Sequence, residues 1–68
     1  MDKLLIGTNV MAARKRANYS QADIAKSIDV SANTVGNWER GTADIPLSKA
    51  WDIADMFDTS IDEMVGRK

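Results

Sequence analysis

Two serine residues that can each begin a helix lie only eleven residues apart, at Ser20 and Ser31. Serine is favoured at a helix start because its hydroxyl accepts a hydrogen bond from a backbone N–H group that the helix leaves unpaired. Gly41 follows the second segment, and glycine is the usual residue just beyond a helix end. The sequence therefore predicts two short neighbouring helices, the first beginning after Ser20 and the second running from Ser31 to Arg40.

The segments on either side have helical spacing as well. Residues 3–17 place aliphatic and small side chains three or four positions apart, and Asn18 suits the end of this first helix because asparagine tolerates the left-handed conformation. Pro46 suits the first turn of a fourth helix, and Ser60 with Glu63 forms a capping box that opens a fifth. The side chains expected to be buried are Ile6, Val10, Ala13 and Ala17 in the first helix, Ile24 and Ile28 in the second, Val35 and Trp38 in the third, Leu47, Ala50, Ile53, Ala54 and Phe57 in the fourth, and Ile61, Met64 and Val65 in the fifth.

Strand signals are weak, because the chain has no sustained alternation of apolar and polar residues and no Asn-Gly or Asp-Gly pair that would close a hairpin. Its 68 residues suffice for one small domain. We therefore expect an all-α fold of five short helices around one core, with residues 1–68 as a single domain.

The composition excludes several kinds of chemistry. The chain has no cysteine and no histidine, which removes thiolate and imidazole metal ligands and most nucleophilic and acid–base groups. Its acidic residues are scattered over separate predicted helices, without a Gly-rich phosphate loop. We expect no metal, no cofactor, no small-molecule substrate and no enzymatic activity. The longest apolar run, Leu4-Leu5-Ile6, is too short to cross a bilayer, and the lack of a signal-peptide pattern favours the cytoplasm.

The net charge of −1 is unevenly distributed. Residues 1–41 carry six basic and four acidic side chains, a balance of +2, whereas residues 42–68 carry three basic and six acidic side chains, a balance of −3. The first part of the chain therefore suits an anionic partner, and the second part does not.

The third predicted helix has two different faces. Wound at about 100° per residue, it places Val35 and Trp38 on one side, toward the core. The opposite side is small and uncharged, with two amides, and is formed by Ala32, Asn33, Gly36 and Asn37. Side-chain amides pair with adenine edges in the major groove of DNA, and small residues allow close approach, so this pair of helices suits a helix-turn-helix. A capped helix with polar residues outside is equally usual in any small helical bundle.

Three runs of residues carry a resemblance to a known family. They are Ser20-Gln21-x-x-Ile24-Ala25, Val30-Ser31-x-x-Thr34-Val35 and Trp38-Glu39-Arg40-Gly41. The match extends to Ile6-Gly7, Arg14, Ile53-Ala54 and Ser60-Ile61-Asp62-Glu63-Met64, or roughly residues 5–66. These residues resemble the phage-repressor and Cro-type (XRE-like) helix-turn-helix family. The resemblance implies a lambda-repressor-like fold, with the second and third helices as the helix-turn-helix, that binds double-stranded DNA.

The resemblance also implies roles for single residues. Base edges are faced by Ala32, Asn33, Gly36 and Asn37, and phosphates are contacted by Gln21, Ser31 and Arg40, with Gln21 also bracing the third helix. Arg14 and Glu39 resemble a pair that joins the first helix to the end of the third. Two departures are present: Asp29 stands where the family often has glycine, and the loop at residues 42–45 has no basic residue and one acidic residue.

The expected function is that of a sequence-specific regulator of transcription, a repressor of prophage or mobile-element type. The alternative is a helical protein-interaction module, antitoxin-like or an adaptor subunit, with little DNA affinity; the acidic second half and the apolar residues Leu4, Leu5 and Met11 would suit it. One reading helix discriminates poorly among competing sites. We therefore expect a weak homodimer on an approximately palindromic operator. The resemblance places its contact surface around the fifth helix, where Met56, Met64 and Val65 lie.

Overall fold

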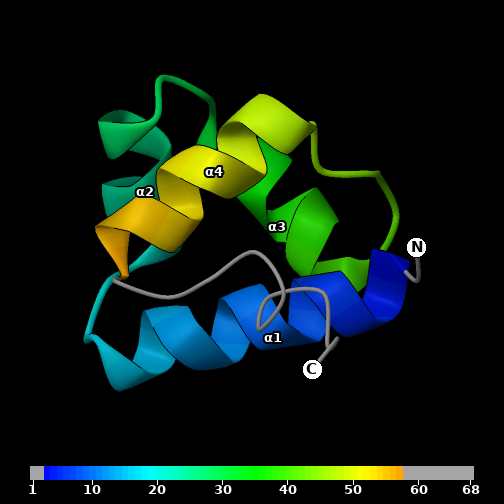
Figure 1. Ribbon diagram of the computed structural model, residues 1–68, viewed down its shortest axis with the longest axis horizontal. Coiled ribbons are helices and arrows are strands. Elements are labelled where there is room, and N and C mark those ends of the chain that lie inside the picture. Colours follow the sequence, from blue (N-terminus) through cyan, green and yellow to red (C-terminus); the bar gives the residue numbers. More distant parts are fainter. Residues whose placement is uncertain (1–2, 58–68) are drawn as a thin grey trace.

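The computed structural model describes residues 3–57, which form four helices and no strand. These are α1 (Lys3–Arg16), α2 (Gln21–Ser27), α3 (Ala32–Arg40) and α4 (Leu47–Met56). Figure 1 shows α1 along one side, with α2, α3 and α4 packed together on the other. The expected all-helical fold is confirmed, each observed helix begins within two residues of its predicted start, and α1 and α3 end within one residue of their predicted ends. The fifth helix, predicted from Ser60, lies outside the described residues.

The core is formed by side chains from all four helices, and most of them were expected from helical spacing. Val10, Ile24, Val35 and Ile53 are completely enclosed. Around them lie Ile6, Ala25, Ile28, Trp38, Ala50 and Ala54, with Val30, Ala43, Ile45, Met56 and Phe57 packed against the outside of this cluster.

Two residues expected in the core are exposed instead. Ala17 follows the last residue of α1, and the chain leaves the helical path at the next residue, so the spacing of three to four no longer applies there. Leu47 is the first residue of α4 and is 63% exposed, since it lies one turn before Ala50, beyond the edge of the core. Helical periodicity thus predicted the middle of each helix correctly and failed at the ends.

Side-chain caps begin both helices of the central pair. The Ser20 hydroxyl accepts from the Asp23 backbone N–H at 3.0 Å, and the Asp23 carboxylate accepts from the Ser20 N–H at 2.9 Å, which forms a reciprocal capping box. The bond from the Ser20 backbone N–H lowers the pKa of Asp23. At the start of α3, the Ser31 hydroxyl accepts from the Thr34 N–H at 3.1 Å. Both predicted serine caps are confirmed, whereas Pro46 precedes α4 directly instead of lying within its first turn.

The first three helices end in the same way, with a residue in the left-handed conformation. Asn18, Asp29 and Gly41 have φ values of 63°, 60° and 74°. The next residue in each case donates its N–H back to a carbonyl five positions earlier, as Val30 does to Ala25 at 2.9 Å. The left-handed conformation that suited Asn18 is confirmed, and Asp29 and Gly41 adopt it as well.

Replacing Asp29 with glycine should change the free energy of unfolding by less than about 1 kcal/mol. Glycine removes the strain of the left-handed conformation but adds freedom to the unfolded chain, and the two effects are similar in size. Thermal unfolding of the variant measures the balance. Asp29→Val is the matched control, because a branched side chain does not tolerate positive φ and should lower the melting temperature clearly. An Asp29→Gly variant as unstable as Asp29→Val would contradict this explanation.

The crossing of α1 and α3 is unusually close at Gly7, which is buried. A Cβ atom added there would lie 2.0 Å from the carbonyl oxygen of Trp38 and 2.9 Å from that of Glu39. The backbone of α1 therefore rests directly on the end of α3. This contact sets the position of α3 relative to the rest of the protein.

Candidate nucleic-acid interface

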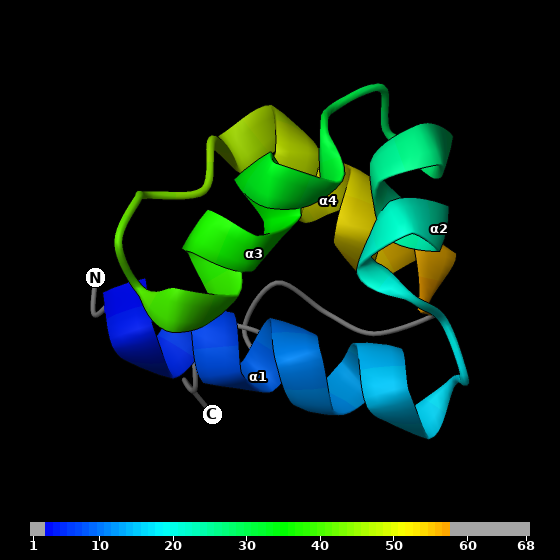
Figure 2. The same ribbon diagram turned by 180° about the vertical axis from the view of Figure 1, so that it is seen from behind.

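The start of α3 presents an uncharged surface to solvent. Ala32 and Asn33 are exposed and Asn37 is partly exposed, while Val35 and Trp38 on the other side are 0% and 4% exposed. Viewed from behind, α3 lies in front of α4 and beside α2 (Figure 2). The helix is thus anchored through its inner side chains and leaves its amides on the outside.

Gly36 differs from this expectation, because it is buried under two polar side chains. A Cβ atom on Gly36 would lie 3.0 Å from Nη1 of Arg40 and 3.5 Å from Oε1 of Gln21. The missing side chain therefore makes room for Arg40 and Gln21, and Gly36 is not part of the open outer face in this structure. Sequence spacing could not show this, because the covering side chains come partly from α2.

Arg40 and Asn37 are joined on the surface of α3. Nη2 of Arg40 donates to Oδ1 of Asn37 at 2.5 Å. The residues are three positions apart, so they lie on the same side of the helix. The structure thus brings Gln21, Gly36, Asn37 and Arg40 together in one polar patch, with Ser31, Ala32 and Asn33 at the opposite end of α3.

A buried carboxylate ties α1, α2 and α3 together. Glu39 accepts from Nε of Arg14 at 2.7 Å, from Nη2 of Arg14 at 3.1 Å and from Nε2 of Gln21 at 3.0 Å. The side chains of Arg14 and Glu39 are only 12% and 3% exposed. Hydrogen bonding to Glu39 raises the pKa of Arg14, so the guanidinium stays charged. The expected Arg14–Glu39 pair is confirmed. Gln21 also donates to Glu39, and this bond links the start of α2 to the end of α3, as the expected bracing requires.

Two further hydrogen bonds and one ring contact hold the segments on either side of α2 and were not expected from the sequence. Nη1 of Arg14 donates to the Tyr19 carbonyl at 2.9 Å, and Nζ of Lys49 donates to the Ile28 carbonyl at 2.7 Å. Tyr19 also packs its ring against Phe57, with 5.7 Å between ring centroids. No sequence pattern predicts such bonds, because any lysine or arginine side chain can donate to a backbone carbonyl that lies near it in the fold.

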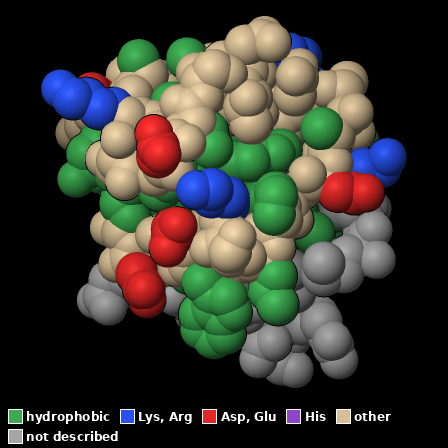
Figure 3. Space-filling view, turned by 90° about the horizontal axis from the view of Figure 1, so that it is seen from above, with side chains coloured by type: hydrophobic (Ala, Val, Ile, Leu, Met, Phe, Trp, Pro, Cys, Tyr) green, Lys and Arg blue, Asp and Glu red, His purple; other side chains and the backbone are tan. Residues whose placement is uncertain are grey.

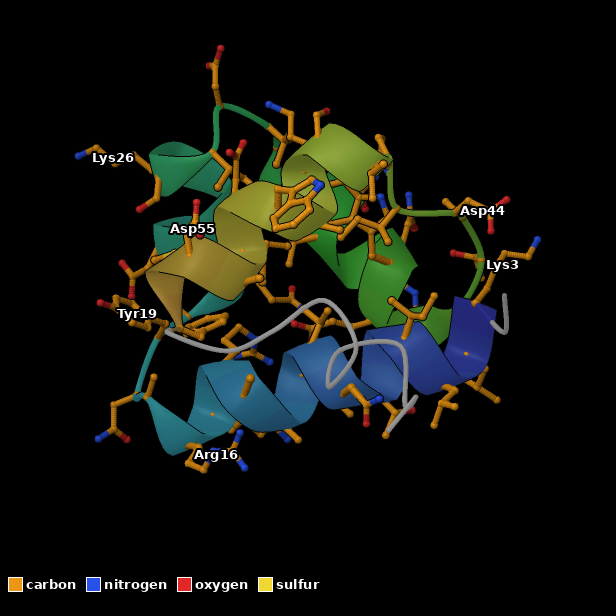
Figure 4. The ribbon with its side chains drawn as sticks, viewed as in Figure 1. Lys3, Arg16, Tyr19, Lys26, Asp44 and Asp55 are labelled. Atoms are coloured by element: carbon orange, nitrogen blue, oxygen red, sulfur yellow. The ribbon has the colours of Figure 1, made fainter. Side chains whose placement is uncertain are left out.

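The charged residues of α3 are Glu39, which is buried, and Arg40, which is exposed in the last turn. In Figure 3, the upper part of the surface, on the side from which Figure 2 is viewed, consists of uncharged side chains and backbone with charged groups at its edges. Lys26 points away from the molecule at the α2 side (Figure 4). Asp44, the acidic residue of the loop after α3, lies at the same end of the molecule as Lys3, and both line a hollow of about 300 Å³. The loop therefore adds no cation to this face, as expected from its composition.

Within residues 3–57, no helix has the length and apolar character that crossing a membrane requires. In the same part of the chain, no three acidic side chains come together in a group that could hold a metal ion.

Comparison with known proteins places these features in a family. HTH-type transcriptional regulator ImmR of Bacillus subtilis (strain 168) is 24% identical over 62 residues, which are 91% of this chain and 49% of ImmR. The chain thus spans about half the length of that relative. Among solved structures, the SOS-response transcriptional repressor LexA from Eubacterium rectale has a TM-score of 0.89 at 28% identity, covering 98% of this chain and 71% of LexA.

A second solved structure, the P22 c2 repressor protein in complex with a synthetic operator, has a TM-score of 0.86 at 23% identity. The similarity covers 94% of this chain and 97% of that repressor. The family described as Helix-turn-helix matches residues 10–64, a range that includes all of α2, α3 and α4. The chain therefore belongs to the helix-turn-helix family, with α2 and α3 as its paired helices.

Proposed function

We propose that this protein binds specific sequences of double-stranded DNA in the cytoplasm and regulates transcription, as a repressor of prophage or mobile-element type. The observation that carries the proposal is the presentation of α3. Its uncharged outer face is exposed at Ala32 and Asn33, and its inner side is held rigidly by Val35, Trp38 and the buried Glu39. A rigid helix with amides on its outer face suits reading of base edges in the major groove.

The roles of the single residues follow from their positions on the two helices. Ala32, Asn33 and Asn37 are proposed to face base edges, and Gln21, Ser31 and Arg40 to contact phosphates. Gly36 is proposed to lie near base edges only where the Arg40 side chain that covers it moves aside. Gln21 and Ser31 lie at the starts of α2 and α3, and helix starts favour anions because their N–H groups point outward. Gln21 uses Nε2 for Glu39, and the second N–H of that amide group remains for a phosphate.

Selection of bound sequences from a random pool of duplexes tests the function. The protein should enrich one motif, and its affinity for that motif should fall as salt rises, because phosphate contacts release counterions. Binding that is salt-dependent but shows no preferred sequence would contradict specific regulation.

The runner-up is a protein-interaction module with little DNA affinity, and specific features favour it. Leu4 and Leu5 are 60% and 42% exposed on α1, and the loop after α3 lacks a basic residue. In that case the same pool should yield no enriched motif and no salt-dependent complex at micromolar protein.

Replacing Asn33 with alanine should weaken binding to the preferred site by about 1–3 kcal/mol and relax the preference at one or two base pairs. Asn33 is exposed at the start of α3, where side chains of a reading helix reach bases. Titration of the selected duplex and of a random duplex measures the loss of specific and of non-specific affinity. Ser27→Ala is the control, since Ser27 is exposed at the far end of α2. An equal loss on both duplexes would show that Asn33 does not read bases.

We further propose a weak homodimer, mostly monomeric when unbound, on an approximately palindromic operator with half-sites roughly 34–36 Å apart. The proposed contact surface lies around the segment from Ser60 that the sequence predicts to be helical, which is outside the described residues. Met56 borders this surface, although it also packs against the core of its own chain. When one subunit of the dimer has bound its half-site, the second subunit binds the other half-site in an effectively intramolecular step. This raises the affinity for the operator and the discrimination against other DNA sequences. Sedimentation should show one protein molecule without DNA and two on the palindrome; a full-affinity complex of one molecule on a single half-site contradicts the dimer.

A further inference from the structure

We propose that Arg40 determines which base Asn37 reads, by fixing the orientation of the Asn37 amide so that it selects guanine instead of adenine. Arg40 acts here as a positioning residue and Asn37 as the group that touches the base. The inference rests on the proposed function, since it concerns the DNA sequence that α3 recognises.

The geometry of the patch defines the orientation of the amide. Nη2 of Arg40 lies 2.5 Å from Oδ1 of Asn37. A guanidinium group has only N–H donors, so the atom that it contacts must be the amide oxygen and not the amide nitrogen. The Nδ2 group of Asn37 is consequently the end left for another partner.

Gly36 is what allows the guanidinium to lie in this place. Nη1 and Cζ of Arg40 would be 3.0 Å and 3.6 Å from a Cβ atom at Gly36, so the planar group covers the glycine closely. Gln21, whose amide nitrogen is held by Glu39, covers the same glycine with its oxygen. The guanidinium of Arg40 is therefore packed over Gly36, and from there it reaches Asn37 on the surface of α3.

The orientation of the amide changes its preferred base. An asparagine that reads adenine uses its oxygen to accept from the N6 amino group and its nitrogen to donate to N7. In this structure Oδ1 already accepts from Arg40, so an adenine amino group would have to use the second lone pair of the same oxygen. It would then lie beside the Arg40 cation, donor next to donor, which weakens the hydrogen bond that adenine can form. Guanine offers two acceptors, O6 and N7, in the major groove, and these match the Nδ2 donor of Asn37 and lie favourably near the Arg40 cation.

This role is compatible with a phosphate contact by Arg40. The guanidinium carries five N–H donors in a fixed planar arrangement, and the structure assigns one of them to Asn37. The remaining donors can bind a phosphate oxygen while the amide orientation is kept.

The test is selection from a random duplex pool with four proteins: the unchanged chain, Asn37→Ala, Arg40→Met and Lys26→Met. Asn37→Ala identifies the base pair that Asn37 reads, because this variant should lose its preference for one base at that position of the selected motif. Arg40→Met keeps the stem of the side chain over Gly36 but removes every donor. Lys26→Met is the matched control, since Lys26 is an exposed cation on α2 that points away from the molecule (Figure 4). Melting curves should be unchanged for Arg40→Met, because Arg40 is exposed.

The unchanged chain should prefer guanine over adenine by roughly tenfold at the base pair identified by Asn37→Ala. Arg40→Met should shift that base pair toward adenine and leave the other positions alone, whereas Lys26→Met should weaken binding without altering any base preference. Three results would overturn the inference and leave the proposed function intact. The unchanged chain could prefer adenine at this base pair, Arg40→Met could keep the preference of the unchanged chain there, or Asn37→Ala could change the preference at no base pair. If the unchanged chain enriches no motif at all, the proposed function fails and the inference fails with it.

Discussion

Replacing Gly7 with alanine should lower the free energy of unfolding by about 3 kcal/mol or more. Alanine is the better helix former by roughly 1 kcal/mol, so an isolated helix would gain stability. In the folded protein, however, the new methyl group would lie 2.0 Å from the Trp38 carbonyl oxygen, and this atom belongs to helix backbone that cannot rotate away. The helices must separate, which loses packing around Val10 and Val35.

Thermal unfolding followed by circular dichroism measures this effect, and the melting temperature should fall by more than about 10 °C in a chain of this size. Gly36→Ala is the matched control, since Gly36 is also a helical glycine. Its nearest neighbour is the end of the Arg40 side chain, which can move, so this variant should keep or gain stability. Equal melting temperatures for Gly7→Ala and the unchanged chain would mean that α1 and α3 do not cross as closely as described.

Replacing Arg14 with methionine should cost about 3–5 kcal/mol, because it leaves a buried charge without its partner. The Glu39 side chain is only 3% exposed and receives two hydrogen bonds from Arg14. After the substitution the carboxylate keeps only the bond from Gln21 among those described. The bond from Arg14 to the Tyr19 carbonyl is lost as well.

The double variant Arg14→Met, Glu39→Leu separates charge burial from packing. Apolar side chains of similar size often replace a buried ion pair at little cost, so the double variant should recover most of the stability lost by the single one. Denaturant unfolding of the unchanged chain, of the single variants Arg14→Met and Glu39→Leu and of the double variant gives the coupling free energy. If the double variant is as unstable as the sum of the two single ones, Arg14 and Glu39 act independently and the network does not join the helices.

The sequence predicted the four described helices because three kinds of local signal agreed. Apolar spacing indicated the buried sides of the helices, Ser20 and Ser31 indicated two starts, and Asn18 and Gly41 indicated two ends. Each of these signals depends on residues within one or two helical turns. The errors at Ala17 and Leu47 arise where a helix extends beyond the core, which depends on the tertiary arrangement and not on local spacing.

The candidate site was predictable only in its general position. The face of α3 follows from its own periodicity, and the resemblance indicated the Arg14–Glu39 pair. The covering of Gly36 and the Arg40–Asn37 bond depend on side-chain conformations and on a neighbour from α2, so helical spacing alone placed Gly36 on the open face. The Lys49 bond to the Ile28 carbonyl joins residues 21 positions apart, and no sequence pattern specifies it.

The shortness of α2 has a consequence for how long the protein survives in a cell. A helix of seven residues is far below the roughly 12–15 residues at which an isolated helix becomes even marginal in water. It therefore exists only while Ile24 and Ala25 are packed in the core, and α3, with nine residues, depends on the core in the same way. Opening of α2 removes Ile24 from the core, and opening of α3 removes Val35, and these are two of the four completely enclosed side chains, so either event costs much of the stability of the fold. Proteolytic turnover should accordingly follow the global unfolding equilibrium, so that a ligand that binds only the folded chain slows degradation in proportion to its occupancy.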